Sequence, residues 1–116
     1  MRQFIACAFL CSSVLLSAAP VGAEPAVGAG VGTYTCDQFI HDTRADAGKL
    51  PLFVSWAQGW MTGWNLAQQD QAKPIADLAA ISIPDQQAFL MAYCAAHPKA
   101  LFMEAAYRLR ERMLTK

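Results

Sequence analysis

The sequence predicts an all-α protein, a small single-domain bundle of about four helices closed by one disulfide. Apolar residues recur at intervals of three and four along most of the chain, which is the spacing of amphipathic helices. No run of alternating β-branched residues appears, so the pattern does not require strands. Two cysteines, Cys36 and Cys94, flank most of the helical region, and a covalent link between them would suit a domain of this size.

The first 23 residues are typical of a cleaved signal peptide. Arg2 gives a positive start, residues 4–19 form an apolar run, and residues 21–23 are the small residues that a signal peptidase reads. A membrane anchor is the alternative, but serines interrupt the run and Pro20 ends it short of the ~20 residues that a span needs. We therefore expect cleavage after Ala23, a periplasmic location, and no membrane association after cleavage.

The expected mature chain divides into a flexible N-terminus, residues 24–33, and a helical domain, residues 34–116. Residues 24–33 are rich in Gly, Ala and Pro and have no periodicity that could bury a face. Removing Arg2 from nine basic and nine acidic residues leaves eight against nine, a net charge of −1 with neutral His. This balance does not indicate a nucleic-acid partner. With every carboxylate protonated, the eight basic side chains and two histidines would give about +10, a strong self-repulsion.

The cysteines predict a disulfide between Cys36 and Cys94. Cys7 and Cys11 lie within the expected signal peptide and lack the preceding residues of a lipid-attachment site. The remaining even pair, in an oxidising compartment, is expected to be bonded. In the chain-entropy model, closing the loop from residue 36 to residue 94 stabilises the fold by about 4 kcal/mol.

A zinc site is the alternative for the same cysteines, since His41 and His97 complete the ligand types of a Cys2His2 centre. Cys36 and His41 would point about 140° apart on a helix, and His97 stands just before a proline at a helix boundary. We therefore expect no metal, and surface or capping positions for both histidines.

The first helix is expected to begin at Thr35, which with Gln38 forms a capping box, and to end near residues 46–48. The second, residues 51–70, carries all three tryptophans on an apolar stripe of Phe53, Trp56, Trp60 and Trp64. Flanking apolar residues widen this stripe, and Gly59 and Gly63 would let another backbone approach. The plain interpretation is a core helix; the alternatives are a dimer interface or a ligand-binding aromatic patch.

Residues 71–83 are expected to connect to a third helix, residues 84–96, with a helical turn at residues 75–80 on the way. Ser82 favours the start of the third helix and Pro98 its end. The fourth helix, residues 98–115, is expected to pair Glu104 with Arg108. Its basic end is expected to be a solvated face that suits the helix dipole; the residues are Arg108, Arg110, Arg112 and Lys116.

Enzymatic chemistry is not indicated. The sequence has no glycine-rich phosphate loop, no HExxH and no GxSxG, and the disulfide would leave no free cysteine nucleophile. The nine carboxylates are scattered singly and are not paired at helical spacing. We therefore expect a protein that is not an enzyme and needs no cofactor.

Two segments resemble a known family: Thr35-Cys36-Asp37-Gln38-Phe39-Ile40 and Tyr93-Cys94-Ala95-Ala96-His97-Pro98. They are similar to the cysteine-bearing ends of the HdeA/HdeB family of periplasmic acid-stress chaperones, over about residues 34–106. The resemblance implies an inactive homodimer near neutral pH that dissociates and partly unfolds in acid, then holds unfolding client proteins. It implies that Cys36 and Cys94 form the bridge, and that Phe53, Trp56, Trp60 and Trp64 form the client or dimer surface.

The tryptophan-rich segment departs from that pattern. Together with residues 93–98 and the helix that follows, it resembles the small exported Tai-type immunity proteins of type VI secretion, which neutralise one effector by binding it. A third alternative is a related helical domain that binds something else. The first two alternatives make another protein the partner, either unfolding clients or one specific protein, and an exposed Trp60 or Trp64 beside Gly59 and Gly63 would favour a partner site.

Overall fold

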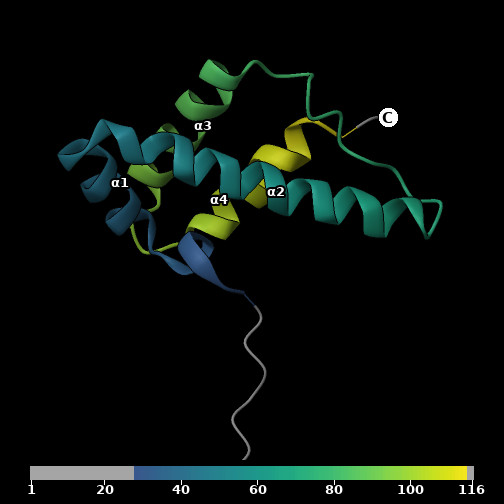
Figure 1. Cartoon of the computed structure of the whole chain (residues 1–116), viewed down its shortest axis with the longest axis horizontal. Helices are drawn as coiled ribbons and strands as arrows, with labels where there is room; N and C mark the ends of the chain where they lie inside the picture. The colour runs from purple at the N-terminus through teal and green to yellow at the C-terminus, as the bar shows by residue number, and fades with distance from the viewer. Residues whose placement is uncertain (1–27, 115–116) are drawn as a thin grey trace, which may run out of the picture.

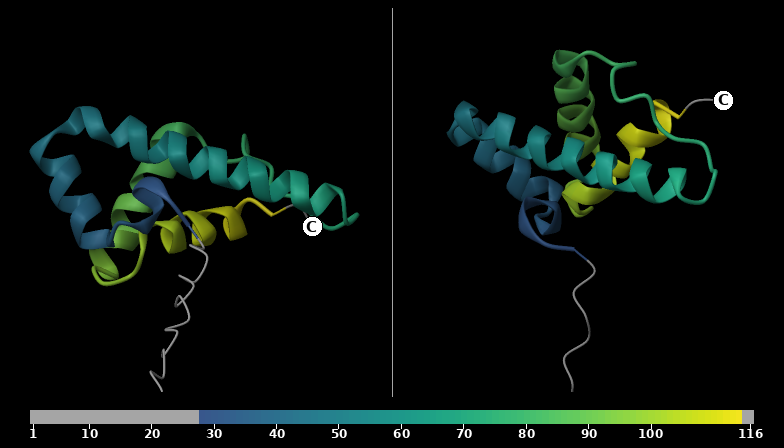
Figure 2. Two further views of the ribbon diagram at one scale, coloured as in Figure 1. Left: turned by 60° about the horizontal axis from the view of Figure 1, so that its bottom comes forward. Right: turned by 45° about the vertical axis from the view of Figure 1, so that its right-hand side comes forward.

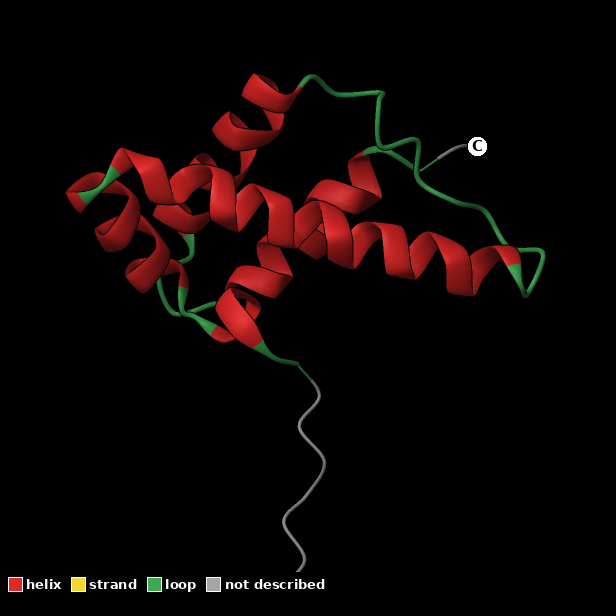
Figure 3. Cartoon of the chain, viewed as in Figure 1, coloured by secondary structure: helices red, strands yellow, loops and turns green. Residues whose placement is uncertain are grey.

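The computed structural model describes residues 28–114, and this part of the chain is helical (Figure 1). The elements are η1 (Gly30–Thr33), α1 (Cys36–Ala45), η2 (Ala47–Lys49), α2 (Leu50–Gln69), α3 (Ile83–Ala96) and α4 (Phe102–Arg112). Between residues 28 and 114 there is no strand, only two isolated bridges (Figure 3). The all-α prediction is confirmed. The predicted signal peptide, residues 1–23, lies outside the described residues.

The long helix α2 runs across the molecule, with α1 turning back at its N-terminal end and α4 crossing beside its middle (Figures 1 and 2). Helix α3 packs against both α1 and α4. The short turn η2 joins α1 directly to α2 and contacts both helices. This arrangement leaves one side of α2 without a covering helix.

Local capping fixes the starts of two helices where the sequence predicts them. Thr35 Oγ1 accepts from the Gln38 amide at 3.2 Å, and Gln38 Oε1 accepts from the Thr35 amide at 2.8 Å, which completes the capping box of α1. Ser82 Oγ accepts from the Asp85 amide and caps α3 in the same position. The α2 helix has Pro51 in its first turn, as expected.

The disulfide between Cys36 and Cys94 is present, as predicted, and joins the first residue of α1 to the last turn of α3 across 58 positions of sequence. Both cysteines are fully buried. Because the two sulfurs are bonded to each other, neither is available as a zinc ligand. His41 is exposed and His97 is the C-cap residue of α3, the kinds of position expected for them.

Three phenylalanines from three helices meet at the centre of the core. The ring centroids of Phe39 and Phe102 lie 4.7 Å apart, those of Phe39 and Phe53 4.8 Å, and those of Phe53 and Phe102 5.1 Å. These distances lie in the favourable range for aromatic pairs. The cluster holds α1, α2 and α4 together, and the disulfide adds α3.

The predicted start of the fourth helix at residue 98 is wrong, because residues 98–101 are used to complete α1. The Pro98 carbonyl accepts from the Asp37 amide and the Ala100 carbonyl from the Cys36 amide, at 2.9 and 2.8 Å. Phe102 in turn donates to the Tyr34 carbonyl. A helix over residues 98–101 would withdraw these carbonyls and leave the first amides of α1 without acceptors. Helix α4 therefore begins at Phe102.

Two side-chain amides fasten the segment between α2 and α3. Asn65 donates to the Ala76 carbonyl at 2.7 Å and accepts from its amide at 2.9 Å. The buried Gln86 donates to the carbonyls of Leu78 and Ile81. With its backbone held in this way, the segment makes one hydrogen-bonded turn at residues 77–80 where a helical turn over 75–80 was expected.

The described part of the expected flexible N-terminus is ordered against α2. Residues 30–33 form η1, whose Gly32 is buried against the Trp56 ring. Gly30 has a φ of +66°, a conformation that glycine adopts without strain. The composition of residues 24–33 gave no sign of this packing, because glycine contributes a close approach and no apolar side chain.

Candidate functional site

Helix α2 carries no charged residue along its whole length, from Leu50 to Gln69. One side faces the core and is buried; its residues are Phe53, Val54, Ala57 and Met61. The opposite side faces solvent, and its two leucines, Leu52 and Leu66, are 57% and 59% exposed. An uncharged helix side in water is unusual for a monomeric surface, where polar and charged residues are the rule.

The three tryptophans lie on the boundary between these two sides of α2. Trp56, Trp60 and Trp64 are each half-buried, and the ring centroids of Trp60 and Trp64 lie 5.6 Å apart. Trp56 reaches Phe102 of the core at 6.1 Å. The tryptophans therefore pack against the core and also expose part of their rings. Neither a core helix nor a binding surface alone describes this stripe.

Phe53 does not belong to this surface in the folded chain, contrary to its expected role in a client or dimer surface. Its side chain is 1% exposed and packs in the phenylalanine cluster. The stripe spaced at three and four residues is broad, and Phe53 occupies the part of it that points at α1 and α4. Position on the helix circumference therefore separates Phe53 from the tryptophans.

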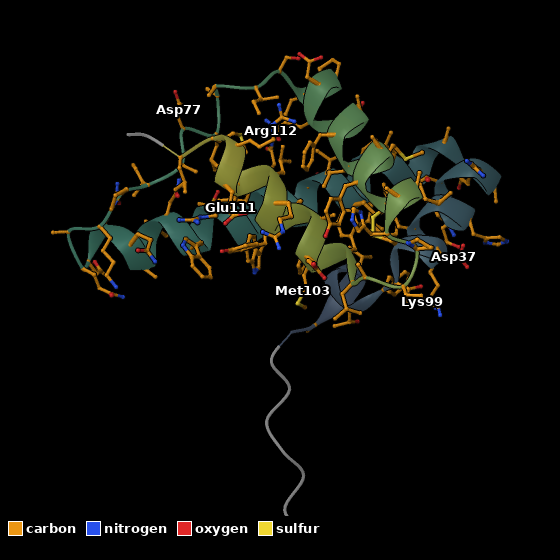
Figure 4. All side chains as sticks on the ribbon, turned by 180° about the vertical axis from the view of Figure 1, so that it is seen from behind. Asp37, Asp77, Lys99, Met103, Glu111 and Arg112 are labelled. Atoms are coloured by element: carbon orange, nitrogen blue, oxygen red, sulfur yellow. A yellow bond between two sulfur atoms is a disulfide. The ribbon has the colours of Figure 1, made fainter. Side chains whose placement is uncertain are left out.

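An open pocket of about 630 Å³ lies along the tryptophans, and we call it the tryptophan groove. A Cβ atom added to Gly59 or to Gly63 would meet nothing within 4 Å, so this stretch of helix backbone is accessible. Met103, at the start of α4 (Figure 4), also lines the groove, and its side chain lies against Gly28. No lining residue is charged; they are Gly28, Ala29, Ser55, Trp56, Gly59, Trp60, Trp64 and Met103.

Replacing Gly32 by alanine is expected to lower the free energy of unfolding by about 1–3 kcal/mol, because a Cβ there would overlap the Trp56 ring and displace a wall of the tryptophan groove. The matched control is Gly59→Ala, which has open space and replaces a helical glycine, with an expected gain of about 0.5–1 kcal/mol. Urea unfolding of both variants measures the difference. Equal effects at the two positions would contradict the packing of η1 on Trp56.

The carboxylates of the described chain all lie at or near the surface, and several hold short polar contacts. Asp42 pairs with Lys49 at 3.2 Å and with His41 at 3.3 Å. Both hydrogen bonds lower the pKa of the Asp42 carboxyl, and the one to Lys49 has the larger effect. Arg108 donates to Glu111 at 3.0 Å, which lowers the pKa of Glu111. These pairs link neighbouring turns and do not form a cluster that could act in acid–base catalysis.

Helix α4 differs from its expected surface in two respects. Arg108 pairs with Glu111 and not with Glu104, whose carboxylate accepts from the Tyr93 hydroxyl at 3.0 Å. Burial, followed by this hydrogen bond, raises the pKa of Tyr93. Arg110 was expected on a solvated face, but it is 5% exposed and its guanidinium lies over the Trp64 ring, 4.7 Å from the centroid. Arg110 belongs to the same basic run as Arg108 and Arg112, which are exposed, so the burial of Arg110 was not predicted from the sequence.

The arrangement is suited to binding an apolar or aromatic segment. In residues 28–114 no three His, Cys, Asp or Glu side chains come together as a set that could hold a metal ion. Among the described helices, none is long and apolar enough to cross a membrane. A scan of protein-family models, a search of curated proteins and a search of solved structures each found no match to this chain.

Proposed function

We propose that this protein binds other polypeptides through the tryptophan groove and the uncharged side of α2, as a periplasmic acid-stress chaperone that holds unfolding proteins at low pH. The observation that carries the proposal is the groove itself, in which half-buried tryptophans lie beside exposed glycine backbone and no lining residue is charged. Aromatic side chains offer large contact area with little loss of conformational freedom, and such sites favour extended or helical polypeptide segments.

The distribution of charge supports acid as the trigger. Every described carboxylate is at least partly exposed, so each can be protonated without prior unfolding. Protonation would remove the Asp42 and Glu111 pairs and the Asp46 cap of η2. It would also leave a net charge of about +10 on the chain that follows the expected signal peptide. The resemblance of the two cysteine segments to the HdeA/HdeB family points the same way, and the disulfide would tether the loosened chain.

The folded state is expected to lose stability as the pH falls through the acid range. Asp42 and Glu111 have folded pKa values below their ordinary values of 3.8 and 4.5, so their stabilisation is complete above those values and disappears as the pH drops through the lowered ones. Urea midpoints measured from pH 7 to pH 2 should therefore decline, and less steeply in Asp42→Asn and Glu111→Gln. Asp70→Asn is the control, because the Asp70 side chain makes no polar contact within residues 28–114. An unchanged slope in all variants would contradict the assignment.

The direct test of function is suppression of aggregation of an acid-labile client by the purified protein at pH 2–3 and at pH 7, with tryptophan emission followed in the same samples. Suppression in acid alone, with red-shifted emission, is the expected result. Gly59→Lys should abolish most of it by filling the groove with a cation, whereas Gln69→Lys adds the same charge at the exposed end of α2 and should not. Equal activity of the two variants would overturn the role of the groove.

A dedicated inhibitor of one partner is the second candidate, and the specific observation that favours it is that the groove is already formed in the folded chain. The resemblance to Tai-type immunity proteins agrees with it. This candidate predicts unchanged tryptophan emission between pH 7 and pH 2–3 and no general suppression of aggregation. That result would reject the chaperone and leave tight binding of a single protein near neutral pH.

A further inference from the structure

Arg110 is a buried cation that forms no ion pair among the described residues. Its side chain is 5% exposed, and no described oxygen lies within hydrogen-bond or ion-pair distance of the guanidinium. The Nε atom is buried without a partner, and desolvation lowers the pKa of the group. Its guanidinium lies over the face of Trp64, at 4.7 Å from the ring centroid. The cation–π contact supplies no hydrogen-bond acceptor for the buried Nε–H group.

The Trp64 side chain also has a buried donor without a hydrogen-bond partner. Its indole Nε1 is buried and has no acceptor among the described residues. Indole and guanidinium groups are donors only, so the pair Trp64 and Arg110 presents unsatisfied N–H groups and no lone pair. The neighbouring arginines of α4 are not in this position: Arg108 is paired with Glu111, and Arg112 is exposed over Phe89. Unpaired buried donors are rare in folded proteins and call for an explanation.

We propose that Arg110 and Trp64 form a carboxylate-binding site beside the tryptophan groove, which Trp64 lines. A carboxylate supplies two acceptor oxygens and a negative charge, which match the planar guanidinium and satisfy the indole N–H. Trp64 also lines the groove, so a polypeptide whose apolar side chains contact the tryptophans would bring an adjacent carboxylate to this site. The carboxylate is either the C-terminal group of the bound chain or an Asp or Glu side chain. The inference rests on the proposed polypeptide binding for the origin of its ligand.

The test is a titration of the purified protein at pH 7, observed by NMR at the Trp64 indole N–H and the Arg110 Nε–H. The probes are N-acetyl-leucine, N-acetyl-leucinamide and N-acetyl-glutamic acid amide, which offer a terminal carboxylate, no carboxylate and a side-chain carboxylate. Saturable downfield shifts of both signals with one or both carboxylates, and not with leucinamide, are expected. Which acid binds more tightly identifies the source. No shift with either acid, or equal shifts with leucinamide, would overturn the proposal.

Two substitutions separate a binding role from a packing role. Arg110→Met should weaken carboxylate binding by at least about 10-fold, and Trp64→Phe, which keeps an aromatic ring but removes one donor, by about 5-fold. Arg112→Met is the matched control, an identical change at an exposed α4 arginine that lies over the Phe89 ring, and should leave binding unchanged. Equal loss in both methionine variants would reject the site. If carboxylate binding is found without suppression of aggregation, the chaperone proposal is rejected and this site stands. Suppression of aggregation without carboxylate binding would reject this site and leave the chaperone proposal standing.

Discussion

Removing the disulfide is expected to lower the free energy of unfolding by about 4 kcal/mol, enough to abolish stable folding in a domain whose total stability is of that order. The bond links positions 58 residues apart, so its loss frees a long loop in the unfolded chain. Both sulfurs are fully buried, and serine hydroxyls in their place would need hydrogen-bond partners. The variant Cys36→Ser/Cys94→Ser is therefore expected to be largely unfolded at 37 °C.

Circular dichroism and urea unfolding of the oxidised protein, the reduced protein and this double variant measure the effect. The reduced protein is the control for the serine hydroxyls, because it loses the loop constraint and keeps sulfur at both positions. We expect the reduced protein to be less stable than the oxidised one and the double variant to be the least stable. A double variant as stable as the oxidised protein would show that the core holds the four helices without the bond.

Replacing Phe102 by alanine is expected to cost about 3–5 kcal/mol, the range for deletion of a fully buried aromatic side chain. Phe102 is the first residue of α4 and its ring contacts Phe39, Phe53 and Trp56. The alanine variant would leave a cavity between three helices and remove support from the tryptophan groove. The tryptophan emission of the variant should shift to the red as well.

Phe102→Leu is the matched control for that cavity, since it keeps most of the volume and should retain a cooperative transition. Phe89→Ala removes a half-buried ring on α3 and should cost less than Phe102→Ala. Thermal and urea unfolding of the three variants give the order directly. If Phe89→Ala were the most damaging, the centre of the core would lie between α3 and its neighbours and not at the phenylalanine cluster.

The sequence was informative where structure is decided locally or by cysteine chemistry. Thr35 and Gln38 form their capping box whatever surrounds them, because all the atoms involved lie within one turn. The start of α3 at Ser82 and the extent of α2 follow from similar short-range rules. The pairing of Cys36 with Cys94 was predictable because only these two remain after the expected signal peptide.

Prediction failed where a residue's role depends on a distant partner. Residues 98–101 are not helical because the amides of α1 require their carbonyls, and Gly32 is buried because Trp56 lies over it. In both cases the partner is far away in sequence, so no local pattern reports the contact. Glu104 is a further example, because its carboxylate accepts a hydrogen bond from Tyr93 and does not pair with its expected partner, Arg108.

By itself, the sequence determined the fold class, the helices α1 to α3 and the disulfide, because helical periodicity, capping and cysteine pairing are properties of short segments and of residue counts. Only the tertiary structure decided that Phe53 is core while the tryptophans next to it on α2 line an open groove, and that Arg110 is buried against Trp64 while Arg108 and Arg112 are exposed. The physical reason is that the width of an apolar stripe does not say how much of it neighbouring helices cover. That depends on where α1, α3 and α4 pack.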